Sequence, residues 1–141
     1  NKKLIIKLRP YEDDNGEIKI AKEIDPTIQV IKSGEILPLI NSSNFMISLG
    51  TSLSNVILDA HILKTPVIRI PFAEWNGPPD QLRESSCFNI PIEKFEITLQ
   101  KLFTDKKFKN ELIDQGQKFV NDCLDNQGIS AENITKYFKN F

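Results

Sequence analysis

The stretch from residue 44 to residue 70 reads NFMISLGTSLSNVILDAHILKTPVIRI and contains the strongest indications of the fold. It begins with an apolar run at 45–49, interrupted only by Ser48, and ends with a second apolar run at 66–70. The run at 45–49 is typical of a strand that is buried on both faces of a parallel sheet, and the run at 66–70 predicts the next strand. Between them, the spacing of the apolar residues predicts a helix that begins at Gly50-Thr51-Ser52 and continues to about Leu63. The stretch therefore predicts a strand–helix–strand unit.

The flanking sequence continues this alternation. Upstream, the pattern predicts a strand, a helix, a strand and a short helix, at 3–8, 17–24, 28–31 and 33–40. Downstream, it predicts a short strand and three helices, at 88–92, 93–103, 106–124 and 130–141. Gly128 is expected to end the middle helix of these three with a left-handed cap.

Strands that alternate with helices favour a parallel sheet with helices on both faces. The sequence therefore predicts an α/β, Rossmann-like fold with additional C-terminal helices. We expect one domain over residues 1–141, because a chain of 141 residues is of ordinary domain size and can bury a core. The chain enters a strand almost directly after Asn1, and we interpret it as the C-terminal half of a larger two-domain protein.

Composition narrows the function classes. The chain is 40% hydrophobic and 26% charged, with a formal net charge of -1, which is typical of a globular protein. Nucleic-acid binding is not expected, since no excess of basic residues is present. A transmembrane segment is not expected either, because no apolar run approaches the roughly 18–20 residues that span a bilayer. These features favour a cytoplasmic protein.

The cysteines and the histidine do not suggest a catalytic or metal site. Cys87 and Cys123 are far apart in the sequence, and His61 is the only histidine. No metal-ligand spacing results, and Cys–His catalysis would need further partners. We expect both cysteines to be inert, partly buried thiols.

Ligands of open parallel sheets bind outside the carboxyl ends of the strands. Three predicted loops lie at that edge, at 9–11, 32–35 and 50–52. Gly50-Thr51-Ser52 is the most informative, because a glycine and two hydroxyl residues at a helix start offer backbone and side-chain donors to an anion such as a diphosphate. The alternative is an ordinary helix N-cap by Thr51 or Ser52.

Polar residues also form a stripe on the helix that follows. The helix is expected to be largely buried, and Ser52, Asn55 and Asp59 lie at i, i+3 and i+7 on one side of it. Buried polar groups need partners, and a ribose with two hydroxyls would satisfy the Asp59 carboxylate. The alternative is that Asp59 faces water or pairs with a nearby lysine.

This order of motifs resembles the C-terminal, nucleotide-sugar-binding domain of GT-B glycosyltransferases. The similar segments are NFMISLGTS at 44–52, ILDA at 57–60 and KTPVI at 64–68. KLRP at 7–10 is similar to the end of the family's first strand, and GISAENI at 128–134 to the start of its last helix. Asp80-Gln81 resembles the pair that touches the donor sugar. The superfamily also includes UDP-N-acetylglucosamine 2-epimerases and bacterial glycerophosphate-polymer transferases.

The chain departs from the family pattern in three places. Arg9 stands where many members have histidine; arginine can hold a phosphate but cannot act as an acid or base. Asp59 replaces the usual glutamate and is one methylene shorter. The paired glycines followed by two glutamates of the epimerases are absent from 50–60, which favours a transferase over an epimerase.

The resemblance implies a donor-binding half of a glycosyltransferase of polysaccharide or glycoconjugate biosynthesis. Its ligand would be a nucleotide sugar, most simply of UDP type, and neither a cofactor nor a metal is implied. The residues implied to bind the nucleotide and its phosphates are Arg9, Ser33, Gly34, Gly50, Thr51, Ser52, Asn55 and Asp59. The donor sugar would contact Asp80 and Gln81, and no catalytic residue is assigned.

Two kinds of partner and several alternative functions stay open. The acceptor and the general base would come from an N-terminal acceptor domain of the same protein or from a separate partner subunit, so the chain alone is expected to be inactive. The alternatives are an epimerase-like domain, a glycerophosphate-polymer transferase domain, and a noncatalytic α/β module that docks to another protein through its helices.

Overall fold

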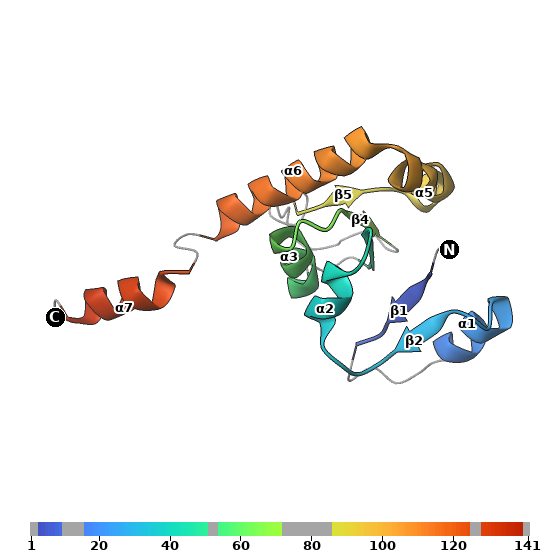
Figure 1. Cartoon of the computed structure of the whole chain (residues 1–141), viewed down its shortest axis with the longest axis horizontal. Coiled ribbons are helices and arrows are strands. Elements are labelled where there is room, and N and C mark those ends of the chain that lie inside the picture. Colours follow the sequence, from blue (N-terminus) through green and yellow to red (C-terminus); the bar gives the residue numbers. More distant parts are fainter. Residues whose placement is uncertain (1–2, 10–15, 51–53, 72–85, 125–127, 140–141) are drawn as a thin grey trace. The chain divides into compact units, whose positions relative to one another are not determined.

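The structure is a computed structural model and describes residues 3–9, 16–50, 54–71, 86–124 and 128–139 (Figure 1). The chain divides into two compact units, Asn1–Ile36 and Leu37–Phe141. Every strand pair found in the described residues is parallel. The α/β, Rossmann-like class with parallel strands and C-terminal helices is thereby confirmed.

The first unit contains two strands and one helix. Its elements are β1 (Ile5–Lys7), α1 (Glu17–Ile24) and β2 (Gln29–Ile31), and β1 pairs with β2. The helix has the predicted ends, because Gly16 precedes it with a φ of 100° and Pro26 prevents its continuation. Only Ala21 and Ile28 are buried among the described residues of this unit, so its apolar core is small.

The second unit contains a three-stranded sheet with the order β3-β4-β5. Its elements are, in chain order, α2 (Ile36–Asn41, which begins at the boundary residue), β3 (Met46–Leu49), α3 (Asn55–Ile62), β4 (Val67–Ile70), β5 (Phe88–Asn89), the 3-10 turn η1 (Ile92–Lys94), α5 (Phe95–Thr104), α6 (Lys106–Cys123) and α7 (Ser130–Lys139).

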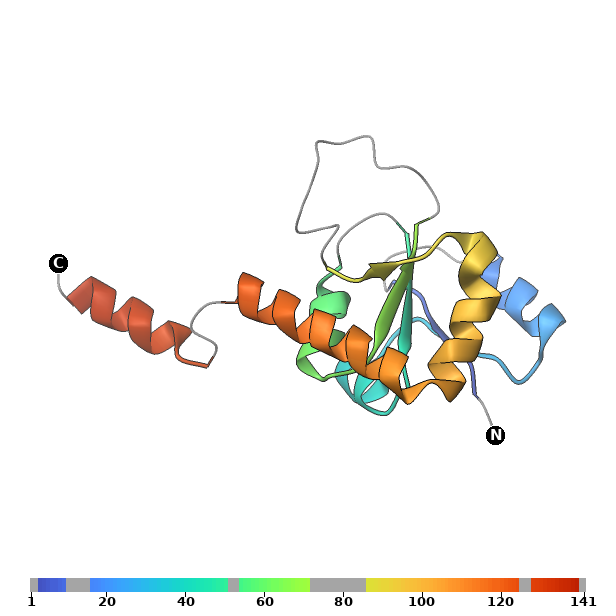
Figure 2. The ribbon, with the colours of Figure 1, turned by 90° about the horizontal axis from the view of Figure 1, so that it is seen from above.

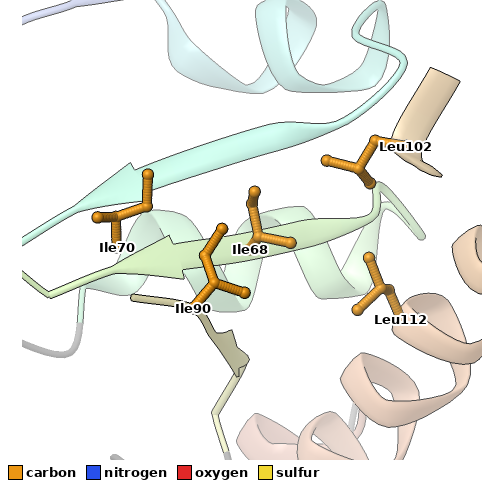
Figure 3. Packing of buried hydrophobic residues seen from close by; sticks show 5 residues of the cluster. All are labelled: Ile68, Ile70, Ile90, Leu102 and Leu112. Atoms are coloured by element: carbon orange, nitrogen blue, oxygen red, sulfur yellow. The ribbon is translucent and has the colours of Figure 1, made fainter. Parts of the chain in front are cut away.

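The core of the second unit forms around β4. All four residues of β4 are buried, so this strand is covered on both faces. The prediction that the strand at 45–49 is buried on both faces is wrong, because residues 46–48 of β3 are only partly buried and Leu49 is exposed. Ile68 and Ile70 of this strand pack with Ile90, with Leu102 of α5 and with Leu112 of α6 (Figure 3). Removal of this apolar surface from water is the main favourable contribution to folding.

Helices α3 and α6 pack against each other in the same unit, as two views of the ribbon show (Figures 1 and 2). At Gly116 of α6, an added Cβ would overlap the imidazole ring of His61 on α3. Phe119 lies edge-to-face with that ring at a centroid distance of 6.0 Å. The side chain of Gln117 donates to the carbonyl oxygen of His61 at 2.5 Å. Any larger residue at position 116 would therefore force the His61 ring to shift.

Several predicted boundaries differ from the structure; α2, for example, begins at Ile36 and not at Ser33-Gly34. The strand predicted at 88–92 is shorter, because η1 begins at Ile92. Helix α6 ends at Cys123 with the extended residue Leu124 as its C-cap, so Gly128 does not cap it. Gly128 has a φ of 80° and instead precedes α7. Helix α3 is also less buried than expected, since Ile62 is exposed and only three of its residues are fully buried.

Candidate functional site

The carboxyl ends of β3 and β4 lie side by side in the second unit. The backbone N–H of Gly50, directly after β3, donates to the carbonyl oxygen of Ile70, the last residue of β4, at 3.1 Å. Gly50 has a φ of 118°, a conformation that side-chain-bearing residues rarely adopt. A glycine with a positive φ therefore follows β3 at the carboxyl edge of the sheet.

Helix α3 begins later than the sequence predicts. Its first residue is Asn55 and its N-cap is Ser54, whose hydroxyl accepts from the N–H of Val56 at 3.4 Å. The prediction that Thr51 or Ser52 begins the helix is therefore wrong, since serine at 54 is an equally favourable cap and lies nearer the apolar segment. Gly50 thus precedes α3 without starting it, and the binding of an anion at Gly50 stays a prediction, because Thr51 and Ser52 lie outside the described residues.

Asn55 and Asp59 lie one turn apart on α3, so their side chains share one side of the helix. Asn55 is exposed and Asp59 is half-buried. Within the described ranges, no lysine or arginine lies within ion-pair distance of the Asp59 carboxylate. The alternative in which a described lysine neutralises Asp59 is thus not observed.

In the first unit, predicted site residues also follow the carboxyl ends of the strands. Arg9 follows β1, and Ser33 and Gly34 follow β2; all three are exposed, and Gly34 has a φ of 101°. The ammonium group of Lys7 donates to the carbonyl oxygens of Leu8 at 2.7 Å and of Lys32 at 3.0 Å. Lys7 therefore links the segment after β1, which leads to Arg9, to the segment after β2, which leads to Ser33-Gly34.

Several predicted contacts lie outside the described residues. They are Thr51 and Ser52 of the glycine turn, and Asp80 and Gln81 of the donor-sugar pair. Their roles stay predictions.

A buried cation on β4 was missed from the sequence. Arg69 is 4% exposed, and its Nε donates to Oδ1 of Asn89 on β5 at 2.6 Å. A charge at such a position is costly unless polar groups surround it. The only sequence signal is a single cation within the apolar run VIRI, one residue before the strand ends. Arg69 places positive charge close to the carboxyl edge of the sheet.

Cys87 and His61 are buried, and Cys123 is partly buried. Burial raises the pKa of Cys87, although the nearby Arg69 charge and a hydrogen bond from Ser86 act in the opposite direction. Cys87 and Cys123 are both free thiols. Burial lowers the pKa of His61, whose Nε2 donates to the carbonyl oxygen of Ser86 at 2.5 Å. His61 is therefore held neutral between α3 and α6 and has no access to a substrate.

The described residues include no group of three histidine, cysteine, aspartate or glutamate side chains that could hold a metal ion. None of the helices in the described ranges combines the length and the apolar character needed to cross a membrane. In comparisons with protein-family models, with curated proteins and with solved structures, the chain matched none.

Proposed function

We propose that this chain is the donor-binding half of a GT-B-type glycosyltransferase and that its second unit binds a nucleotide sugar. The observation that carries the proposal is the juxtaposition at the edge of the three-stranded sheet. A left-handed glycine, Gly50, joins the carboxyl ends of β3 and β4, and α3 follows with Asn55 and Asp59 on one side. Carboxyl edges of parallel sheets are the usual ligand sites of this fold class.

The side chains at this edge suit different parts of a nucleotide. A carboxylate such as Asp59 can accept hydrogen bonds from both ribose hydroxyls, and the Asn55 amide can donate or accept beside it. The charge of Arg69, which is buried near the strand end, favours a diphosphate over a neutral ligand at the same edge. Asp80 and Gln81 are proposed, from the family resemblance, to contact the sugar.

The role of this half in catalysis is to hold the donor and to stabilise the leaving diphosphate. Transfer of a sugar to a hydroxyl acceptor also needs a general base. His61 is excluded from that role by its burial between α3 and α6. The base and the acceptor site are therefore assigned to an N-terminal acceptor domain or to a partner subunit.

A noncatalytic docking module is the second candidate, and one observation favours it. Helix α7 exposes Ile134, Tyr137 and Phe138, at i, i+3 and i+4, with exposed fractions of 58%, 62% and 71%. An apolar helix face of this kind is typical of surfaces that bind another protein. The two candidates differ in nucleotide binding, which only the first requires.

The proposal is tested by calorimetric titration of the chain with UDP, CDP, GDP and CMP, and then with UDP-sugars. A nucleotide that binds only the folded state stabilises it by about 2.7 kcal/mol at one hundred times its dissociation constant. We expect heat of binding and a matching thermal shift with one diphosphate, and no sugar transfer by the chain alone. Absence of binding with all four nucleotides and with the UDP-sugars would refute the proposal.

The family resemblance alone assigns a phosphate contact to Arg9, and this assignment has a separate test. Arg9→Ala should weaken UDP binding about tenfold or more, because a charge-assisted hydrogen bond contributes about 1.5–3 kcal/mol, and should leave uridine binding unchanged. Lys3→Ala is the matched control, since Lys3 is another exposed cation of this unit. Equal losses of affinity for UDP and uridine, or equal effects of the two substitutions, would contradict the assignment.

A further inference from the structure

The second unit has a hollow of about 460 Å³. It is lined by β5 and the two residues that follow it, by η1, by α5 and by the start of α6. It shares neither Gly50 nor any residue of α3 with the proposed nucleotide site. Its volume lies within the range of about 300–1,000 Å³ that is common for ligand sites. Nothing in the proposed function uses this hollow.

The floor of the hollow is apolar and exposed. Phe88 of β5 and Phe108 of α6 meet edge-to-face, with ring centroids 5.8 Å apart and an interplanar angle of 82°. Ile97 of α5 completes the apolar lining, and Phe88 and Ile97 are both exposed. Aromatic pairs of this geometry form rigid apolar surfaces against which another side chain can pack.

One wall of the hollow carries two cations. Lys94, Ile97 and Lys101 lie at i, i+3 and i+7, so they form one stripe along α5 and its N-cap. Seven residues of helix separate the two lysines by about 10 Å along its axis. The Nζ of Lys101 lies 5.8 Å from the centroid of the Phe108 ring. Among the described residues, no carboxylate lines the hollow.

The neighbouring strand favours an extended ligand. In the described residues β5 is the last strand in the sheet order β3-β4-β5. The N–H of Ile90 donates to the carbonyl oxygen of Arg69 on β4 at 2.9 Å. Because successive residues of a strand direct their backbone groups to opposite sides, Asn89 directs its N–H and C=O away from β4. An added strand could pair with these groups.

We propose that this hollow docks a short, extended acidic segment of another protein, with an apolar side chain placed between carboxylates. The apolar side chain packs against Phe88, Ile97 and Phe108, and the carboxylates contact Lys94 and Lys101. The distance between the lysines corresponds to about three residues of extended chain. Charge complementarity with the two lysines favours an acidic segment, and the distance between the lysines determines which of its residues lie beside them.

The test uses a fluorescein-labelled peptide of sequence GSEDFEDGS and fluorescence anisotropy with the chain. The double substitution Lys94→Glu with Lys101→Glu should weaken binding at least about tenfold, since like charges then face the peptide. Lys118→Glu with Lys139→Glu is the matched control, because both lysines are exposed on the second unit, lie outside the hollow and change the net charge equally. The control should change the affinity by less than about twofold, as expected for charges remote from the contact. Circular dichroism of all variants checks that each is folded.

Three further measurements complete the test. Peptide GSEDSEDGS, which lacks the phenylalanine, should bind at least about tenfold more weakly, because a buried aromatic side chain is the expected anchor. Peptide-induced NMR shifts should concentrate at Phe88, Ile97 and Phe108. Equal effects of the two lysine pairs, or shifts elsewhere, would overturn the proposal. Tighter binding of dodecyl phosphate than of the peptide at the same residues would also overturn it, in favour of a small amphiphile.

Discussion

The two parallel sheets of this chain have similar edges but very different cores. In each, a strand is followed by a left-handed glycine, Gly34 after β2 and Gly50 after β3. No residue of β1 or β2 is buried, whereas every residue of β4 is. The first unit has two buried side chains among its described residues, and the second has a continuous apolar cluster.

The geometry of the glycine turns and the stability of the two units have different origins. A turn that requires glycine can form on either sheet, since it depends on a few backbone angles. Resistance to local opening depends instead on buried apolar contacts. Asn55 and Asp59 therefore rest on a well-packed scaffold, while Arg9 and Ser33 rest on one that opens more easily. Amide hydrogen exchange should accordingly be slower in β4 than in β1.

The largest expected effect on stability comes from matched leucine truncations in the two units. Leu102→Ala removes a fully buried side chain from the second unit and should lower the free energy of unfolding by about 2–5 kcal/mol. Leu8→Ala removes a half-buried leucine from the first unit and should cost less than about 1.5 kcal/mol, because less apolar area is lost. Urea denaturation followed by circular dichroism measures both. Equal losses would show that the two cores do not differ in this way.

A smaller loss is expected at the contact between α3 and α6. Gly116→Ala should lower the free energy of unfolding by about 1–3 kcal/mol, because the added methyl overlaps the His61 ring. Alanine has the higher helix propensity by about 1 kcal/mol, so any gain in stability would contradict the observed packing. In the His61→Ala background the ring is gone, and Gly116→Ala should become neutral or stabilising. The same double-mutant cycle measures the coupling energy.

The pH dependence of stability gives a third test of the second unit. Burial lowers the pKa of His61 below its ordinary value of 6.5, so the folded chain keeps this side chain neutral where the unfolded chain binds a proton. Stability should therefore fall as the pH drops below 6.5, with a slope of up to about 1.4 kcal/mol per pH unit until the folded-state pKa is reached. His61 is the only histidine. Between pH 7.5 and about 5.5, His61→Gln should remove most of this slope, and an unchanged slope would contradict the assignment.

The sequence predicts elements well where local signals agree. Helix α1 has its predicted ends because Gly16 and Pro26 stand on either side of it. Strand β4 was predicted because a short apolar run followed a proline. The start of α3 was predicted too early, since the hydroxyl residues Ser52 and Ser54 both suit an N-cap. Local sequence alone does not distinguish between them.

The features that were missed depend on contacts between distant residues. The burial of Arg69 depends on Asn89, which is 20 residues away. The role of Gly116 depends on His61, which belongs to another helix. The hollow at β5 is formed by residues of four elements, and no single segment indicates it. In the candidate site, the position of Gly50 after a strand and the placement of Asn55 and Asp59 on one side of a helix were predictable from the sequence. The buried charge of Arg69 near the strand end was not.

The most direct test of nucleotide binding by the second unit is Asp59→Ala, measured for both ligand affinity and stability. The free energy of unfolding without ligand should change by less than about 0.5 kcal/mol, since the carboxylate is only half-buried and has no described ion-pair partner. Affinity for UDP should fall about 10- to 150-fold, which corresponds to the loss of about 1.5–3 kcal/mol. Asp114→Ala, at an exposed aspartate of α6, should change neither quantity. An Asp59→Ala protein that unfolds more easily yet binds UDP as tightly as the unsubstituted chain would contradict the proposed nucleotide site.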